Sequence, residues 1–425
     1  MIKDICIYEP GNTKNYYPFS ILHCIWEIRC GALRTFERVQ KQFEDAEIFY
    51  YGRKEHLDSF FARFSIDPKD KPDRDILYLA GNFIADDEAV KQISKACDDS
   101  SGAQVKIFMK ESAPAGAMIP ADIAGKFIDK SPEEMINSIQ NDPDINKIIL
   151  AVPGGVLLNY LYDAIFENGD MIRYDSGFFE NSEVFYEPAY PNVFAIESVN
   201  IKLGKNVKIG AGAVIDATEG PVIIGGNVEI MPQATVIGPC YIGENSKIKI
   251  GAKIYEDCSF GEYCKVGGEV ENTIIQSYSN KQHEGFLGHS FISEWVNLGA
   301  DTNNSDLKNT YGEISIQLDD IEVDTGKMFL GLLCGDHTKS AINTQFNTGT
   351  AAGIFGILVT EGFLPKFIHS FAWGGRFGSP VYKINKAFEV AEKVMHRRGK
   401  KLLDEEKILI QAEHERCTDA QRKKT

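Results

Sequence analysis

The stretch LGKNVKIGAGAVIDATEGPVIIGGNVEIMPQATVIGPCYIGENSKIKIGAKIYEDCSFGEYCKV, residues 203–266, carries a large apolar residue at every sixth position, apart from one short insertion. The series is Leu203, Ile209, Ile215, then Ile224, Ile230, Val236, Ile242, Ile248, Ile254, Phe260 and Val266. A helix would need a spacing of roughly 3.6 residues, and a half-buried strand alternates at every second residue. Fixed internal repeats indicate a repeat architecture. This repeat predicts a triangular solenoid, in which each hexad forms one flat side and the large residue fills the interior.

A small or slim residue stands four places after most of these large residues. The set is Val207, Ala213, Val228, Ala234, Cys240, Ser246, Ala252, Cys258 and Cys264. We expect these side chains to point inward where a bulky group would not fit, and Gly to permit the turns at the corners. The three cysteines are therefore interpreted as small buried hydrophobic residues rather than ligands.

Composition sets the broad class of protein. The chain has 425 residues, 43% of them hydrophobic, and a net charge of −16. The length suits two or three domains, and the acidic balance disfavours general binding to nucleic acid. The longest apolar runs are too short to span a membrane, and the N-terminus lacks the apolar core of a signal peptide. The nine cysteines show no metal or redox spacing, so a reducing cytoplasm is the expected setting and no metal ligand set is predicted.

The N-terminal part of the chain, up to position 190, alternates between strand-like and helix-like segments. Strands are expected at 5–8, 48–51, 76–80, 105–109 and 148–152, and helices at 32–43, 87–97, 133–141 and 157–167. This order predicts an α/β domain with a largely parallel sheet. We place this domain at residues 1–190, the solenoid domain at 191–380 and a helical tail at 381–425. Within the solenoid we expect an excursion at 267–280 and paired strands at 311–323, and we expect the tail to cap the solenoid end.

The segment KQHEGFLGH, residues 281–289, leads into WVNLGADTNN, residues 295–304, and is the clearest candidate for chemistry. An amine that attacks a thioester arrives as an ammonium and must lose a proton, which a His can accept near neutral pH. Backbone N–H groups of a Gly-rich segment can stabilise the negative charge that develops on the thioester oxygen. His283 is therefore the candidate general base, although histidines on a loop can also be simply solvated.

These motifs resemble known acyltransferases. The repeat looks like the left-handed β-helix of hexapeptide acyltransferases. The segment around His283 resembles the acetyltransferase half of the bifunctional N-acetylglucosamine-1-phosphate uridyltransferase/glucosamine-1-phosphate acetyltransferase family, in which His-Leu-x-Tyr-x-Gly-Asp is followed by Val-Asn-Ile-Gly-Ala-Gly-Thr. The resemblance implies that His283 is the catalytic base, that Asn297 contacts the acceptor and that Ala300 faces acetyl-coenzyme A. Phe286 stands where the family has a Tyr, and Asp301 replaces a Gly.

The Bacteroidetes-type alternative branch of this family is a closer match. It is similar to this chain at HEGFLGH (283–289), WVNLGA (295–300), TNNSDLKN (302–309), GDHTK (335–339), INTQFNTGT (342–350) and SFAWGG (370–375). The resemblance implies a homotrimer that binds the coenzyme between adjacent solenoids. It also makes Lys281 and Lys308 candidates for contacts to the acceptor, and His337 and Lys339 candidates for contacts to the coenzyme. A simple turn stabilised by Asp336 would also explain the GDHTK motif.

The N-terminal half resembles a sugar-1-phosphate nucleotidyltransferase less closely. The Gly-rich phosphate loop of those enzymes is missing, and residues 18–34 stand in its place, with Arg29, Gly31 and Arg34 as candidate nucleotide contacts. Arg suits phosphate because of its forked donors, but an isolated Arg is often a surface residue. Asn82 stands where the family has an Asp that holds Mg²⁺, and an amide is a poorer ligand for this ion. Mg²⁺ is therefore only a candidate cofactor of this domain.

The sequence supports three functional hypotheses. The first is transfer of an acetyl group from acetyl-coenzyme A to the amine of a sugar phosphate such as glucosamine 1-phosphate, coupled or not to nucleotidyl transfer from a nucleoside triphosphate. The second is a sugar-1-phosphate nucleotidyltransferase whose β-helix only trimerises or regulates. The third is a solenoid that binds sugar nucleotides without turnover. We favour the first, because the long motifs lie in the acyltransferase half.

Overall fold

The chain forms two compact units. A computed structural model describes residues 2–69, 74–99, 104–180, 182–186, 189–375 and 380–422. The first unit comprises Met1–Thr13, His23–Ile28 and Leu33–Asn159. The second comprises Lys14–Leu22, Arg29–Ala32 and Tyr160–Thr425. Two short N-terminal segments therefore belong to the same unit as the solenoid. In the described parts of the chain, no helix is long and apolar enough to cross a membrane.

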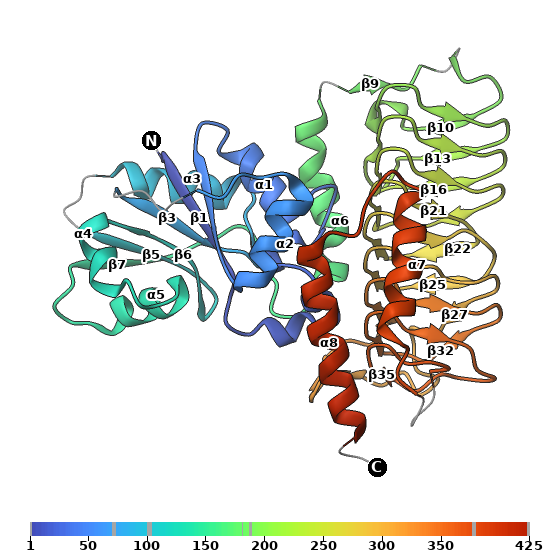
Figure 1. Ribbon diagram of the computed structural model, residues 1–425. Helices are drawn as coiled ribbons and strands as arrows, with labels where there is room; N and C mark the ends of the chain where they lie inside the picture. Colours follow the sequence, from blue (N-terminus) through green and yellow to red (C-terminus); the bar gives the residue numbers. More distant parts are fainter. Residues whose placement is uncertain are drawn as a thin grey trace. The chain divides into compact units, whose positions relative to one another are not determined.

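The first unit is an α/β domain built on a six-stranded mixed sheet of order β2-β1-β3-β6-β5-β7 (Figure 1). Its strands are β1 (Asp4–Tyr8), β2 (Glu47–Tyr51), β3 (Ile76–Ala80), β5 (Val105–Lys110), β6 (Ala113–Ile119) and β7 (Lys147–Ala151), with a separate pair β4 (Phe83–Ile84) and β8 (Val156–Leu157). Its helices are α1 (Thr35–Gln42), α2 (Lys54–Phe64), α3 (Asp87–Asp98), α4 (Ala121–Ala124) and α5 (Pro132–Asn141). The five predicted strands are all present. The sequence did not reveal β6, which runs antiparallel to both β3 and β5, because its Ala and Gly residues form no clear apolar pattern.

The second unit is a left-handed parallel β-helix with three faces (Figure 1). The first face holds β11 (Ile201–Leu203), β14 (Val222–Ile224), β17 (Cys240–Ile242), β20 (Cys258–Phe260), β23 (Ile274–Ile275), β26 (Phe291–Ile292), β30 (Leu332–Cys334), β33 (Thr350–Ala352) and β35 (Phe367–Ile368), with β9 (Glu183–Val184) antiparallel at its edge. The second face holds β12 (Lys208–Ile209), β15 (Glu229–Ile230), β18 (Lys247–Ile248), β21 (Lys265–Val266), β24 (Asn280–Lys281), β31 (Lys339–Ser340) and β34 (Ile357–Leu358). The third face holds β10 (Phe194–Ile196), β13 (Val214–Asp216), β16 (Thr235–Ile237), β19 (Lys253–Ile254), β22 (Glu269–Glu271), β25 (Phe286–Gly288), β27 (Asn303–Asn304) and β32 (Gln345–Phe346).

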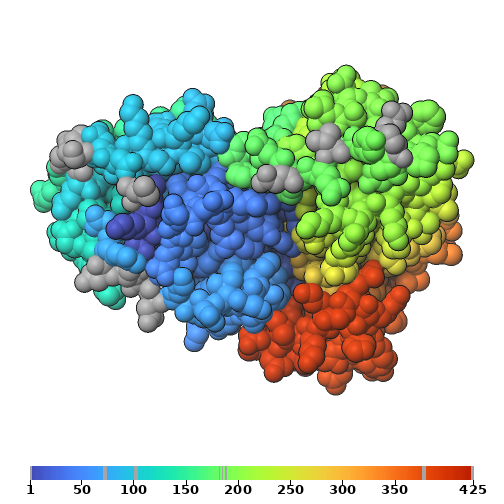
Figure 2. Space-filling view, turned by 90° about the horizontal axis from the view of Figure 1, so that it is seen from above, coloured from blue at the N-terminus to red at the C-terminus, as the bar shows by residue number. Residues whose placement is uncertain are grey.

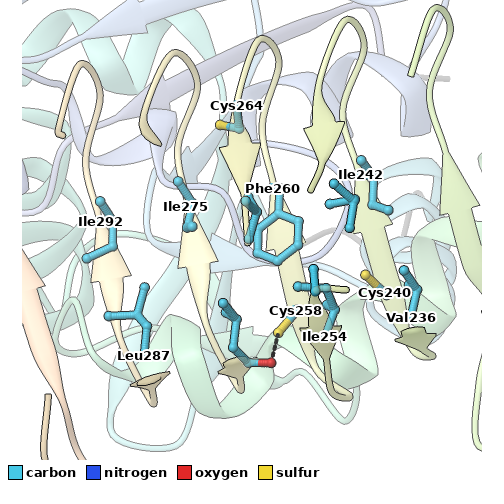
Figure 3. Close-up of a cluster of buried hydrophobic side chains, with 14 of the residues drawn as sticks. Val236, Cys240, Ile242, Ile254, Cys258, Phe260, Cys264, Ile275, Leu287 and Ile292 are labelled. Atoms are coloured by element: carbon cyan, nitrogen blue, oxygen red, sulfur yellow. Dashed lines mark hydrogen bonds between the residues drawn. The ribbon is translucent and has the colours of Figure 1, made fainter. Parts of the chain in front are cut away.

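The predicted hexad positions form the interior of this β-helix. Figure 3 shows Ile242, Ile254 and Phe260 pointing into the same core, together with the slim residues Cys240 and Cys258. All five side chains are fully buried or nearly so. Burial raises the pKa of the Cys258 thiol, as expected for an inert apolar position. The phase of the repeat was therefore predicted correctly.

The predicted excursion at 267–280 is wrong. These residues continue the coils as β22, β23 and the first residue of β24. The strand register shows that one coil is shorter here. The interval from Ser259 to its partner Ile274 is smaller than the interval from Tyr241 to its partner Ser259. The period of six is lost because this coil is short, while the parallel stacking remains. The chain leaves the solenoid later, between β27 and β30, where β28 (Ser315–Leu318) and β29 (Ile321–Asp324) form the predicted paired strands, which run antiparallel.

The corner between the first and second faces carries a ladder of stacked rings. Tyr263, Tyr278, Trp295, His337, Phe355 and Phe371 occupy equivalent positions with positive φ on successive coils. The helical tail forms α7 (Ile384–His396) and α8 (Asp404–Arg422), whose apolar side chains share a core cluster with this ladder. The tail therefore packs along a corner of the β-helix rather than only over its end. The C-terminal residues, red in Figure 2, form one continuous surface.

Short elements from elsewhere in the chain complete the second unit. Helix α6 (Asp163–Asp175) was expected at 157–167 and begins later. It contacts β17 and β20 of the first face. The segment Arg29–Ala32 is tied to it, because the Asn168 carboxamide oxygen accepts a hydrogen bond from the Gly31 N–H at 2.8 Å. The Ser259 hydroxyl donates to the Gly31 carbonyl at 2.8 Å.

Candidate functional site

His283 lies at the corner between the second and third faces, in the segment 282–285 that joins β24 to β25. Its side chain is exposed. The corner ends at Gly285, whose φ of 114° is readily available only to glycine. A Cβ at Gly285 would lie 2.2 Å from the Thr302 carbonyl oxygen of the next coil. Glycine therefore lets the His283 corner stack closely on the coil that follows it.

The next coil brings Asn297 and Ala300 beside this corner. The Asp301 N–H donates to the Glu284 carbonyl at 3.0 Å, so residues 299–302 form the rung directly adjacent to His283. Asn297 pairs with Asn280 in the second face and is half-buried, as is Ala300. The Ala300 carbonyl is already occupied by the Asn343 N–H of the following coil, at 2.8 Å. The structure thus gathers three of the predicted residues on neighbouring coils at one corner.

Lys281, predicted to contact the acceptor, points into the β-helix. Its residue is 2% exposed. The Nζ donates to the carbonyl oxygens of Gly267 at 3.0 Å and His283 at 2.6 Å. Burial lowers the pKa of Lys281 to about 8. Its ammonium therefore lies beneath the His283 corner and binds backbone groups of two coils.

The other predicted lysines and His337 also make internal contacts. His337 is 2% exposed and forms a rung of the aromatic ladder, with its ring 4.5 Å from that of Phe355. The Lys339 Nζ donates to the His337 carbonyl at 2.8 Å, and burial lowers the pKa of Lys339 to about 8. Lys308 lies in the excursion between β27 and β30, where its Nζ donates to the Glu313 carbonyl. These contacts explain the positions of the three residues without a ligand.

The four predicted nucleotide contacts are divided between the two units. Arg29 and Gly31 belong to the second unit, where Arg29 is 1% exposed and pairs with Glu262 at 3.0 Å. Arg34 and Asn82 belong to the first unit. The Arg34 guanidinium pairs with Glu37 at 2.9 Å, and the Asn82 amide donates to the Leu158 carbonyl at 2.8 Å. Each of these side chains therefore has an internal partner, and Gly31 serves the packing against α6.

A second polar cluster, which the sequence did not reveal, lies at the corner between the third and first faces. It consists of Glu271, His289 and Asp306, whose ligand atoms all lie within 4.8 Å of one another. The His289 Nδ1 and Asp306 Oδ2 are 2.8 Å apart. Burial, and then the charge of Asp306, raise the pKa of Glu271. An imidazole and two carboxylates could hold a divalent transition metal, but the pairing of His289 with Asp306 also satisfies these groups without one.

A spacing of one coil would have revealed this cluster. Glu271 and His289 are separated in sequence by the same interval as Tyr241 and Ser259, which pair one coil apart, and Asp306 follows His289 at nearly that interval. Residues separated by one coil share a corner in a three-faced solenoid. Applied to the polar residues of the repeat, this rule would have placed all three side chains together.

Comparisons with known proteins match parts of the chain to proteins named as transferases. Residues 5–183 match the family described as sugar nucleotidyl transferase. A bifunctional sugar-1-phosphate nucleotidylyltransferase/acetyltransferase of Sulfurisphaera tokodaii is 30% identical over 93 residues, which cover 21% of this chain and 23% of that relative. YaiX of Escherichia coli K12, named as an uncharacterized acetyltransferase, is 33% identical over 162 residues, which cover 37% of this chain and 70% of YaiX.

The solved structures include a glucose-1-phosphate thymidylyltransferase from Bacillus anthracis in complex with sucrose. It covers 40% of this chain and 96% of its own, with 10% identity and a TM-score of 0.32. This likeness is too low to support an argument about function.

The fold and the sequence matches define the class of protein. It combines a domain that matches the sugar nucleotidyl transferase family with a left-handed β-helix. By its match to 70% of YaiX at 33% identity, the chain belongs to the family that includes YaiX.

Proposed function

We propose that the protein transfers an acetyl group from acetyl-coenzyme A to the amine of an amino-sugar phosphate of the glucosamine 1-phosphate kind. The observation that carries this proposal is the stacking of the exposed His283 corner on the Ala300 corner, through the 3.0 Å hydrogen bond from Asp301 to Glu284. An exposed imidazole, which can accept a proton near neutral pH, thus lies beside the corner formed by Gly299, Ala300 and Asp301. The acetyltransferase names of the two sequence relatives support acetyl-coenzyme A as the co-substrate.

The proposed reaction assigns one proton transfer to this chain. His283 accepts a proton from the acceptor ammonium, which frees the nitrogen lone pair. The amine then attacks the thioester carbonyl carbon and an N–C bond forms. As the C–S bond breaks, the second proton lost from nitrogen passes to the departing sulfur, which leaves as the coenzyme thiol. Asn297, on the adjacent coil, would orient the acceptor. The Glu284 side chain, next to His283 in sequence, pairs with Lys253 at 3.7 Å.

A thiol-release assay with acetyl-coenzyme A and a panel of amino-sugar phosphates tests the proposal. His283→Ala should lower turnover by roughly 10²- to 10⁴-fold. His396→Ala is the matched control, because His396 is also an exposed histidine and lies on α7. Parental thiol release by His283→Ala would defeat the assignment of the base. Absence of thiol release from the parent protein across the panel would defeat the proposed reaction.

Sugar-1-phosphate nucleotidyl transfer by the first unit is a second candidate function. The match of residues 5–183 to the sugar nucleotidyl transferase family favours it. The test is Mg²⁺-dependent release of pyrophosphate from nucleoside triphosphates mixed with sugar 1-phosphates. If no pyrophosphate is released with nucleoside triphosphates of any of the common bases, the second candidate function is wrong.

We also propose assembly as a homotrimer and membership of the Bacteroidetes-type branch. The support is the resemblance of the motifs, together with exposed apolar residues on the last coils of the β-helix, namely Ile342, Val359, Phe363 and Trp373. Light scattering at micromolar concentration should give three times the 47.3 kDa chain mass. The mass of a single chain would remove the proposed groove between solenoids.

A further inference from the structure

Lys281 occupies a position that its neighbours in the second face give to apolar side chains. The strand register pairs Ile248 with Val266, and Val266 with Lys281. Ile248 and Val266 are fully buried, and Lys281 is 2% exposed. Because paired residues of a parallel sheet point the same way, the Lys281 side chain starts inside the β-helix. A lysine here replaces the apolar residue that the solenoid would otherwise use.

The ammonium reaches the underside of one corner, where the space is kept open by glycine. A Cβ at Gly268 would lie 2.7 Å from the Lys281 Nζ and 2.7 Å from the His283 carbonyl oxygen. Gly268 has φ of 74°, so another residue would be strained as well as crowded. The Nζ can therefore bind the Gly267 carbonyl on one coil and the His283 carbonyl on the next, at 3.0 and 2.6 Å.

This arrangement is costly for the fold. Burying a charged group is unfavourable unless partners compensate it, and apolar replacements of buried charged groups are often neutral or stabilising. The structure shows no carboxylate within ion-pairing distance of Nζ among the described residues. A Met or Leu would fill the same column without this cost. The lysine is therefore better explained by what its ammonium holds than by the stability of the core.

We infer that Lys281 is a positioning residue, whose ammonium ties the His283 carbonyl to the preceding coil and so fixes the direction in which the imidazole projects. The importance of this role for turnover rests on the proposed function of His283. The role itself is a property of the corner and can be measured without activity. Displacement of a reacting group by about 1 Å can cost up to about 10²-fold in rate, so a loosened corner should be visible in turnover.

Two variants of the full chain test the inference. Lys281→Met keeps the length and removes the donor. Lys247→Met is the matched control, because Lys247 lies on β18 in the same face, with its side chain directed outward and 47% exposed. Hydrogen exchange followed by mass spectrometry should show the Phe286 and Asp301 amides, which donate to Asn303 and to the Glu284 carbonyl, exchanging at least about tenfold faster in Lys281→Met and unchanged in Lys247→Met. Thiol release should show a kcat about tenfold or more lower with an unchanged KM for acetyl-coenzyme A.

The outcomes separate this inference from the proposed function. If the parent protein releases no thiol, the proposed function fails, while the exchange measurement still decides the role of Lys281. His283→Ala should exchange like the parent, because Lys281 binds the backbone carbonyl and not the imidazole. Unchanged exchange of the Phe286 and Asp301 amides in a folded Lys281→Met protein overturns the inference. Lys281→Gln is the second variant, and failure of both to fold would make Lys281 a requirement of the solenoid itself, which also overturns it.

Discussion

Replacing Lys281 by Met should change how the stability of the protein depends on pH. Burial lowers the pKa of Lys281 from its ordinary value of 10.5 to about 8, an effect that Glu284 and Asp301 partly oppose and Lys253 reinforces. This difference corresponds to a cost of about 3 kcal/mol for keeping the ammonium charged in the folded protein. The full cost is present below pH 8, where the lysine is charged in both the folded and the unfolded protein.

The sign of the pH dependence follows from proton binding. Between pH 8 and 10.5 the unfolded chain binds more protons at Lys281 than the folded protein does, so this residue makes the parent more stable as the pH rises. Methionine does not titrate. The stability of Lys281→Met relative to the parent should therefore be greatest near pH 7 and should fall by about 2 kcal/mol by pH 9.5. Other titrating groups, including the buried cysteines, are shared by both proteins and cancel in the comparison.

Equilibrium unfolding in urea, followed by far-ultraviolet circular dichroism at pH 7.0, 8.5 and 9.5, measures this difference. At pH 7 the variant should be at least as stable as the parent, because relief of the buried charge offsets the loss of two hydrogen bonds worth about 1 kcal/mol each. A difference in free energy that stays constant from pH 7.0 to 9.5 would refute the reasoning. It would mean that the Nζ is as well solvated in the folded protein as in the unfolded chain.

Three further predictions concern other positions. Ile242→Asp should lower the free energy of unfolding by several kcal/mol, because a carboxylate would enter the interior. Ile250→Asp, at a residue that is 58% exposed, should melt like the parent. Equal melting of both variants would contradict the hexad phase. Glu271→Gln should raise the melting temperature at pH 7, because the raised pKa of Glu271 means that its ionised form destabilises the folded protein. The gain in melting temperature should disappear below the ordinary carboxyl pKa of 4.5. An equal gain at pH 7 and pH 4 would contradict this cause. His337→Ala should lower the melting temperature, because it opens a gap in the aromatic ladder. A raised KM for acetyl-coenzyme A with unchanged melting would instead support the predicted coenzyme contact.

Part of the candidate site could be predicted from local sequence. The motif around His283 and the WVNLGA segment are each a continuous stretch of sequence. Both lie at one corner, because the coil length brings them to adjacent rungs. The nucleotide contacts could not be predicted in this way. Arg29 is a candidate because residues 18–34 stand where the family has its Gly-rich loop, but its guanidinium pairs with Glu262, 233 residues away in sequence. Side-chain type alone does not show whether an ion-pair partner exists elsewhere in the fold.

The sequence by itself determined the solenoid, the burial of its hexad positions and the five strands that were expected in the first unit. Such patterns are local, because a repeat of fixed length or an apolar run indicates which side chains are buried. The tertiary structure decided which residues pair on adjacent coils. The coil from Val266 to Lys281 is shorter than the coil from Ile248 to Val266, so the period of six no longer tells which residues point inward. Only the hydrogen bonds between stacked coils set that register, and they place a lysine in the interior beneath His283.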